Sequence, residues 1–276
     1  MDYRFKGDIK FMNNYDLYLY ELINRKRSNG YNQTENNAFD ALKTKIEIWA
    51  DVNYFKVEIK KSGSKEKGDA ISGKSDIDIF VSIEDSYNDY SIEYYRNSLF
   101  EYLEGHYNYV RNQDVSIGIN YNGIDIDVTP GKKINTIYSF GKHFIYSRED
   151  SKRIMTNIDK QIMTIKSCMH IDEIILMKIW KSINNIKFPS IAIELITIEC
   201  FTHNYHYETS IIERIKTLMD YIIDNIETIK LYDPGNPSND VLEDFSIQKR
   251  KIIKNALEKD LIDIQCNPNS IKQVFK

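Results

Sequence analysis

The stretch SGSKEKGDAISGKSDIDIFVSI, from Ser62 to Ile83, joins a glycine-rich turn to a strand that carries two carboxylates. Its second half alternates Asp and Ile from Asp76 onward and then becomes apolar, which is the two-residue period of a strand with one buried face. Asp76 and Asp78 are therefore expected on one strand face, about 7 Å apart. Two carboxylates this close repel each other unless a cation lies between them, and oxygen ligands suit Mg²⁺.

A second strand is expected just upstream, where apolar and polar residues alternate from Tyr54 to Lys60. Gly63 and Ser64 follow it. A glycine that leaves a strand lets backbone N–H groups approach an anion, and a serine hydroxyl can donate to a phosphate oxygen. The pair is therefore a candidate phosphate-binding turn, after which Gly68 and Gly73 allow the chain to turn back into the strand of Asp76 and Asp78.

Length and composition indicate an ordinary globular protein. The 276 residues are enough for one or two domains, and the three cysteines form no C-x-x-C pair. The chain has no apolar run near the roughly 20 residues that span a bilayer and no signal-peptide core, so we expect a cytoplasmic protein without membrane association. A net charge of −4 argues against a surface built to hold long nucleic acid.

The pattern of elements changes at about residue 151. Before it, a hairpin is expected at Asn122-Gly123, and 131–150 is expected to be a loop. After it, strand patterns vanish, and Ser210 with Glu213 forms a capping box for one helix. We therefore expect an α+β part at 1–150 and a helical part at 151–276, with helices at 13–28, 36–51, 91–107, 157–169, 171–186, 189–203, 210–230 and beyond Ser246.

The order of strand, Gly-Ser turn, glycine-spaced loop and D-x-D strand resembles the nucleotidyltransferases of the DNA polymerase β superfamily. Their signature runs h-G-S, G-T, D-h-D-h, and here it stands as Gly63-Ser64, Gly68-Asp69 and Asp76-Ile77-Asp78-Ile79. Asp69 occupies the position where the family usually has threonine. An extra negative charge there would weaken triphosphate binding.

The same resemblance implies a third catalytic carboxylate on a later strand. The family pattern h-D-h-x-P places it at Asp127, which precedes Val128-Thr129-Pro130. Asp125 lies on the same strand face, one pleat away, and is expected to be a solvated edge residue.

Three later segments narrow the resemblance. Lys178-Ile179-Trp180 is similar to the K-h-W of 2′-5′ oligoadenylate synthases, whose lysine contacts the triphosphate, and Ser190 is similar to a serine that faces phosphate in the next helix. The turn from Asp233 to Asn239 resembles their D-P-x-x-P-x-N. Overall, residues 40–260 look most like the bacterial cGAS/DncV-like nucleotidyltransferases (CD-NTases) of CBASS antiphage signalling. Ile191 stands where many relatives have a tyrosine that stacks on the base.

The resemblance implies a polymerase-β-like core with a mixed sheet, a C-terminal helical domain, and an active site in the cleft between them. It implies that two Mg²⁺ ions, or Mn²⁺, are held by Asp76, Asp78 and Asp127. It further implies that the triphosphate is held by Gly63, Ser64, Lys178 and Ser190. NTPs would be joined into a cyclic di- or trinucleotide that activates a downstream effector.

Two other functions remain open at this point. One is nucleotidyl transfer to an RNA 3′ end or a small acceptor, which steeply salt-dependent tRNA binding would favour. The other is a catalytically silent nucleotide sensor of the same fold, which the presence of Asp69 in place of the usual threonine would favour. The sequence does not distinguish the bases used, the linkage or the ring size.

Overall fold

The computed structural model describes residues 13–73, 76–84, 89–136, 139–203 and 210–276. The chain divides into two compact units. One is essentially residues 28–167 and contains the sheet, whereas the other combines the chain up to Arg27 with most of the chain from Cys168 onward. These limits differ from the division at residue 150, because the first helix groups with the C-terminal helices and residues 151–167 group with the sheet.

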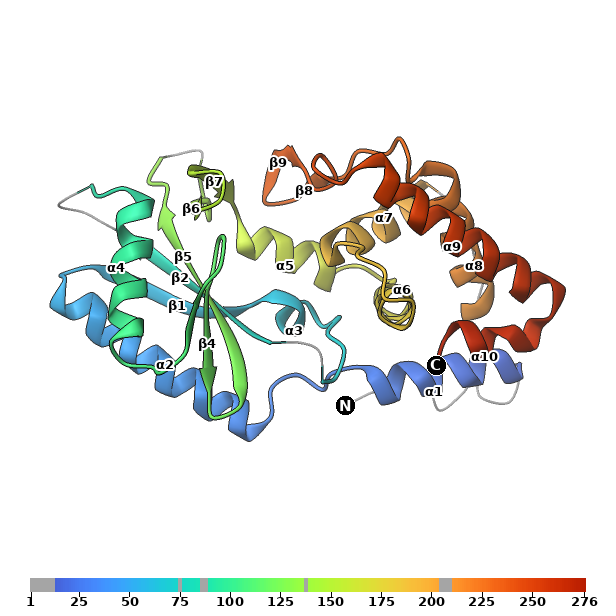
Figure 1. Ribbon diagram of the computed structural model, residues 1–276, viewed down its shortest axis with the longest axis horizontal. Helices are drawn as coiled ribbons and strands as arrows, with labels where there is room; N and C mark the ends of the chain where they lie inside the picture. Colours follow the sequence, from blue (N-terminus) through green and yellow to red (C-terminus); the bar gives the residue numbers. More distant parts are fainter. Residues whose placement is uncertain (1–12, 74–75, 85–88, 137–138, 204–209) are drawn as a thin grey trace. The chain divides into compact units, whose positions relative to one another are not determined.

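A mixed sheet forms the centre of the first unit (Figure 1). Within the described residues its strands run in the order β1-β2-β5-β4-β3. The C-terminal end of β5 also pairs with β6, and β6 pairs with β7. β2 and β5 are parallel neighbours, while β1 pairs with β2 in the antiparallel sense. The strands are β1 Lys56–Ser62, β2 Ile77–Glu84, β3 Val110–Asn112, β4 Ile117–Tyr121, β5 Ile124–Lys133, β6 His143–Ser147 and β7 Lys152–Thr156.

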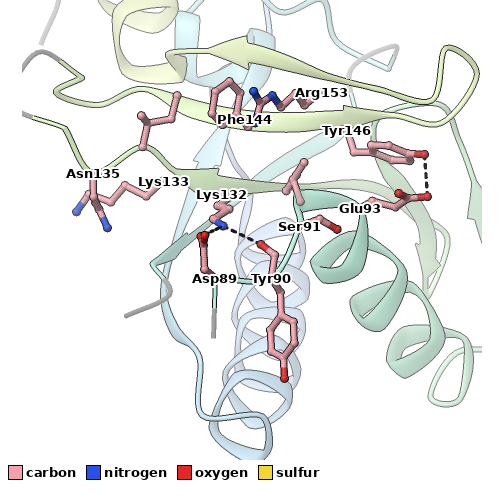
Figure 2. A pocket seen from close by; sticks show the side chains of 12 residues that line it. Asp89, Tyr90, Ser91, Glu93, Lys132, Lys133, Asn135, Phe144, Tyr146 and Arg153 are labelled. Atoms are coloured by element: carbon pink, nitrogen blue, oxygen red, sulfur yellow. Dashed lines mark hydrogen bonds and ion pairs between the residues drawn. The ribbon is translucent and has the colours of Figure 1, made fainter. Parts of the chain in front are cut away.

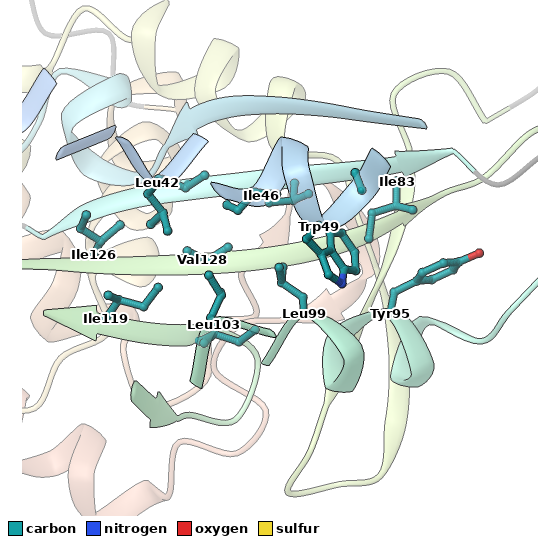
Figure 3. Close-up of a cluster of buried hydrophobic side chains, with 14 of the residues drawn as sticks. Leu42, Ile46, Trp49, Ile83, Tyr95, Leu99, Leu103, Ile119, Ile126 and Val128 are labelled. Carbon is teal, nitrogen blue, oxygen red and sulfur yellow. The ribbon is translucent and has the colours of Figure 1, made fainter. Parts of the chain in front are cut away.

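The main core of this unit lies between one sheet face and two helices, α2 (Gln33–Val52) and α4 (Ile92–Glu104). Apolar residues recur along α2 at spacings of three and four, which places them on one helix face. Burying each large apolar side chain contributes about 1.5–3 kcal/mol. Figure 3 shows side chains of α2, α4 and the strands meeting in this layer, among them Leu42, Ile46, Trp49, Leu99, Ile126 and Val128.

The two-residue period of the strands separates this core from the opposite sheet face. Along β2 the odd-numbered residues from Ile77 to Ile83 are fully buried in the core, so Asp78 faces the other way. Along β5, Ile126 and Val128 are buried in the same core, so Asp127 faces the same way as Asp78. The alternation expected from the sequence is confirmed.

Two helices belong to the carboxylate side of the sheet. α3 (Gly63–Lys67) begins directly after β1, and α5 (Ile158–Lys166) follows β7. Lys166 Nζ of α5 lies 3.2 Å from Glu66 Oε2 of α3, and Lys60 Nζ of β1 lies 2.8 Å from Asp159 Oδ2 of α5. These ion pairs tie α5 to the turn that holds the candidate phosphate-binding residues.

The second unit is built mainly from helices that bury apolar stripes against one another. Arg250, 9% exposed, donates through its guanidinium to the carbonyls of Ile226, Ile229 and Leu242, at 3.0, 3.0 and 2.6 Å. Trp180 Nε1 donates to Asp260 Oδ2 at 2.7 Å. The elements are α1 Asn14–Lys26, α6 Ile171–Ile183, α7 Ser190–His203, α8 Ile211–Asn225, β8 Tyr232–Asp233, β9 Asn236–Asp240, α9 Ile247–Cys266, a 3₁₀ turn Pro268–Ser270 and α10 Ile271–Val274.

Two expectations about secondary structure are wrong. The segment 131–150 is not a loop throughout, because it holds the end of β5 and all of β6, and strands continue past residue 151 as β7, β8 and β9. The sequences of β6 and β7, HFIYS and KRIMT, do not alternate clearly. Their strand conformation depends on pairing with β5 and with each other, which periodicity does not report.

The expected capping box at the start of α8 is also wrong. Ser210 makes no capping hydrogen bond with its side chain. Its Oγ donates to Asp16 Oδ1 of α1 at 2.9 Å, and the Ile212 N–H donates to the same oxygen at 3.0 Å. The cap of α8 thus comes from a residue almost 200 positions away. Among the helices in the described residues, none is both long and apolar enough to cross a bilayer.

Candidate active site

Asp78 and Asp127 are direct neighbours across the parallel pair β2 and β5. Adjacent strands lie about 4.8 Å apart, and both side chains point away from the α2 and α4 core. Asp76 precedes β2 by one residue, on the same side of the alternation as Asp78. The parallel pairing therefore brings two predicted catalytic carboxylates together from positions 49 residues apart in sequence, with the third at the entrance of the strand.

Gly63 is held against the carboxylate of Asp78. Its φ is +69°, and a Cβ placed on it would lie only 1.8 Å from Asp78 Oδ2. The antiparallel pairing of Ser62 with Asp78 produces this close approach, since Gly63 follows directly after the last paired residue of β1. Both the backbone conformation and the lack of room require glycine here. Ser64 lies beside it in the first turn of α3.

All three carboxyl groups have a pKa above the ordinary value. Burial is the main cause for Asp78, and the charges of Asp127 and Asp76 add to it, which raises its pKa to about 6. Burial and then the charge of Asp76 raise the pKa of Asp127. Burial and then the charge of Asp125 raise the pKa of Asp76. The negative charges of these carboxylates thus repel one another, and a bound cation would reduce this repulsion.

Arg111 contributes a positively charged side chain to this site. The sequence alone did not predict its presence there. Its Nη1 lies 2.8 Å from Asp125 Oδ1 and its Nη2 lies 3.7 Å from Asp127 Oδ1. Gly118 on the neighbouring strand leaves the room for it, because a Cβ there would be 2.7 Å from Arg111 Nε. The hydrogen bond from Arg111 lowers the pKa of Asp125. Asp125 is therefore the anchor of Arg111 rather than a simply solvated residue.

Tyr31 is a second residue near the site that the sequence did not indicate. Burial raises its pKa, and the charges of Glu66 and Asp78 raise it further. Lys61 Nζ lies over its ring at 4.2 Å from the centroid. Nothing in the local sequence marks this tyrosine, since its proximity to Asp78 depends on how α2, β1 and β2 pack.

The donor chemistry of the three carboxylates fits a divalent metal. Carboxylate oxygens are the ligands that Mg²⁺ prefers, and Asp127 Oδ1 is buried with no hydrogen-bond donor within the described residues. The side chains do not form a closed ligand shell, because no three Asp, Glu, His or Cys residues of the described segments are grouped tightly enough to hold a metal.

Lys178 and Ser190 belong to the helical unit, whereas the carboxylates belong to the sheet unit. Lys178, on α6, is 4% exposed, and its Nζ lies 2.8 Å from Glu194 Oε1 of α7. Ser190, at the start of α7, accepts a hydrogen bond at 2.8 Å from Lys181 Nζ. Contact of Lys178 and Ser190 with a nucleotide stays a prediction, and the buried ion pair gives Lys178 a structural role within the helical unit.

The two departures from the family pattern lie in different surroundings. Asp69 is completely buried, and its N–H donates to the Ser64 carbonyl at 3.2 Å. Its side chain therefore lies beneath the surface of the loop, where a solvated triphosphate would not meet it directly. Ile191 is half-buried in the first turn of α7.

No family model and no curated protein matches this sequence. The structure, in contrast, is similar to CdnC of E. coli MS115-1 solved with ATP, at 19% identity and a TM-score of 0.71 over 94% of each chain. It is similar to the Bradyrhizobium diazoefficiens CD-NTase CdnG in complex with GTP, at 12% identity and a TM-score of 0.70 over 96% of this chain and 98% of that chain. It is also similar to the CdnE cyclic dinucleotide synthase of Elizabethkingia meningoseptica with GTP and Apcpp, at 16% identity and a TM-score of 0.65 over 87% of this chain and 96% of that chain.

At such low identity the likeness establishes the fold. It confirms the α+β class expected from the sequence, a mixed sheet flanked by helices and followed by a helical region. Because the match extends over nearly all of both chains, this protein has the same fold as CdnC and the CD-NTase CdnG.

Proposed function

We propose that this protein is a Mg²⁺-dependent nucleotidyltransferase that joins NTPs into a cyclic di- or trinucleotide second messenger in antiphage signalling. The observation that carries the proposal is the register of Asp78 against Asp127, with the backbone of Gly63 held against Asp78. Carboxylates on neighbouring strands beside a glycine turn are what metal-assisted transfer to a triphosphate requires.

Each residue of the site has a defined task in this proposal. Asp76, Asp78 and Asp127 would hold the metal, which supplies charge neutralisation at the triphosphate and lowers the pKa of the attacking hydroxyl. Gly63 leaves room for the phosphates and Ser64 donates a hydrogen bond to them. Lys178 and Ser190 of the helical unit would contact the same triphosphate, as the resemblance implies.

The reaction exchanges one phosphorus–oxygen bond for another. A ribose hydroxyl oxygen attacks the α-phosphorus of a second NTP, the bond from that phosphorus to the bridging oxygen breaks, and pyrophosphate leaves while the hydroxyl proton is released. A second transfer within the same pocket closes the ring. Positioning for in-line attack is the main contribution of the protein, because phosphoryl transfer needs little covalent help.

Incubation with labelled NTPs and Mg²⁺ or Mn²⁺, followed by phosphatase, tests this function. Phosphatase removes terminal phosphates, so a resistant product indicates a closed ring, and its mass identifies the bases. The double variant Asp76→Ala, Asp78→Ala and the single variant Asp127→Asn should each lose product formation by at least about 100-fold, since the metal would lose ligands. Asp125→Asn, on the same strand but anchored to Arg111, is the matched control and should retain more activity.

Other outcomes would point to the other functions. A product that phosphatase digests, together with labelling of an added RNA, would indicate transfer to an acceptor. Nucleotide binding without pyrophosphate release would indicate a sensor. Retained ring formation in the Asp76→Ala, Asp78→Ala variant would refute the site assignment.

The biological setting follows from the proposed product. A cyclic oligonucleotide acts by binding a downstream effector protein, so such an effector is the expected partner. The proposed NTP substrates are consistent with a cytoplasmic location, which the sequence led us to expect.

A further inference from the structure

A cavity lies in the sheet unit, away from the carboxylates. It has a volume of about 740 Å³ and is formed by the first turn of α4, the end of β5, and strands β6 and β7. Figure 2 shows Lys132 and Lys133 of β5, Phe144 and Tyr146 of β6, and Arg153 of β7 around it. Its volume falls within the range of small-molecule sites, about 300–1,000 Å³.

The cavity is separate from the candidate active site. Lys132 pairs with Ile83 across β5 and β2, whereas Asp127 pairs with Asp78 five residues earlier along the same two strands. At about 3.3 Å per residue, five residues correspond to about 16 Å. A ligand here would lie near the C-terminal ends of β2 and β5. The candidate catalytic carboxylates lie toward the N-terminal ends of the same two strands.

The described lining combines positive charge with aromatic rings. The guanidinium of Arg153 lies over the Phe144 ring at 4.6 Å from the centroid, which orients it while leaving its side chain exposed. Tyr146 lies two residues from Phe144 along β6 and holds its hydroxyl 2.9 Å from Glu93 Oε1. Lys132 pairs with Phe144 in the register of β5 and β6, so its side chain lies on the same sheet face as Phe144 and Tyr146.

Asp89 is the carboxylate that a ligand anion would displace from Lys132. Lys132 Nζ is bound to Asp89 Oδ1 and also donates to the Tyr90 carbonyl at 2.7 Å, and the Asp89 side chain is 95% exposed. An ion pair whose carboxylate is this exposed contributes little to stability. Lys133, the next residue of β5, projects from the opposite sheet face and pairs there with Glu84 at 3.1 Å.

We propose that this cavity is a binding site for a small aromatic anion, a flat ring that bears a phosphate or a carboxylate. The anionic group binds Lys132 and Arg153, and the ring lies against Phe144 and Tyr146. The proposal rests on the cavity alone and does not depend on the catalytic function proposed above.

Calorimetric titration in low salt with EDTA tests the site. AMP is the phosphate-bearing probe and 1-naphthoate is the carboxylate-bearing probe, and EDTA keeps metal-dependent nucleotide binding from contributing. We expect at least one of them to bind with one-to-one stoichiometry, which also identifies the anionic group preferred. Adenosine has the ring without the phosphate, and inorganic phosphate has the charge without the ring. If AMP is the probe that binds, each of these two compounds should bind at least tenfold more weakly than AMP.

Charge-reversal variants assign the binding to this cavity. Arg153→Glu and Lys132→Glu should each weaken binding at least tenfold. Lys56→Glu is the matched control, because it changes the net charge equally but does not line the cavity. Asp78→Asn should bind the probe as the unchanged protein does.

The proposal fails if neither probe binds, if Arg153→Glu and Lys132→Glu bind as tightly as Lys56→Glu, or if Asp78→Asn abolishes binding. Circular dichroism and thermal unfolding of each variant establish that it is folded. Arg153→Lys, which keeps the charge, should restore part of the affinity lost in Arg153→Glu.

Discussion

Gly63 shows how a single residue can link backbone conformation to the candidate active site. Its positive φ costs any other residue about 1–3 kcal/mol, and a Cβ would also collide with Asp78 Oδ2. Glycine is therefore required for two independent reasons, one concerning the stability of the turn and the other the position of a candidate catalytic carboxylate.

Gly63→Ala should lower the rate of pyrophosphate release by about 100-fold or more, because a displacement near 1 Å of a reacting group can cost that much. Gly123→Ala is the control, since Gly123 has a similar φ of +84° but nothing within 4 Å of an added Cβ. Both variants should lose stability in thermal unfolding, and only Gly63→Ala should lose activity. Equal activity in the two variants would contradict the role given to the Gly63 and Asp78 approach.

Elements of the sheet unit are joined through a buried histidine. His143 of β6 is 4% exposed, its Nε2 lies 2.7 Å from Ser82 Oγ of β2, and its Nδ1 lies 3.0 Å from the Gly141 carbonyl. Burial lowers the pKa of His143, and the charges of Lys60 and Lys133 act in the same direction while the Gly141 carbonyl and Asp159 oppose them. Folding therefore favours the neutral imidazole.

The unfolded chain binds a proton at His143 more readily than the folded chain. The contribution of this residue to stability is thus fully present above the ordinary pKa of about 6.5 and is lost as the pH falls below it, by at most about 1.4 kcal/mol per pH unit. In urea unfolding at pH 7.5 and 5.5, His143→Gln should reduce the difference between the two pH values. His106→Gln, at an exposed position, should leave the difference in stability between the two pH values unchanged. An unchanged difference in His143→Gln would exclude His143 as its source.

Helices α6 and α7 are joined by the buried pair of Lys178 and Glu194. Removing one partner leaves a buried charge, so Glu194→Gln should destabilise the protein by about 3–5 kcal/mol in urea unfolding. The double variant Lys178→Met, Glu194→Leu should recover much of this loss, because well-packed apolar residues often replace such a pair without cost.

The same double variant separates the two roles of Lys178. If it is stable but binds ATP much more weakly in calorimetry, Lys178 contacts the nucleotide as the resemblance implies. If it binds ATP normally, the lysine serves packing alone. A Glu194→Gln variant as stable as the unchanged protein would show that the ion pair is unimportant.

Within the whole molecule, distant parts of the chain meet in the helical unit. Asp16 of α1 caps α8, and the Tyr18 hydroxyl donates to the Phe275 carbonyl near the end of the chain at 2.5 Å. The helical unit is therefore closed by residues from both ends of the sequence.

Asp16→Ala should destabilise this unit by about 1–2 kcal/mol, the usual cost of a lost helix cap. Hydrogen exchange is the suitable measurement, because the Ile212 amide loses its acceptor directly and should exchange faster. Asp16→Asn keeps an acceptor oxygen and should lose less protection. If Asp16→Ala leaves the exchange of the α8 amides unchanged, the cap is not important.

The sequence alone indicated the elements whose signals are local. The alternation around Asp76 and Asp78, the Asn122-Gly123 hairpin and the three- and four-residue spacing of α2 all depend on residues close in the chain, and the structure contains each of them. Asp127 could be predicted for the same reason, because the family pattern that marks it lies within a single strand.

Only the tertiary structure decided the relations between distant segments. The parallel register of Asp78 with Asp127, the position of Arg111 over Gly118 and the capping of α8 by Asp16 each depend on which strands and helices become neighbours. β6 and β7 likewise form because β5 offers an edge for pairing. Periodicity reports which face of an element is buried, but the partner that covers that face is selected by the packing of the folded chain as a whole.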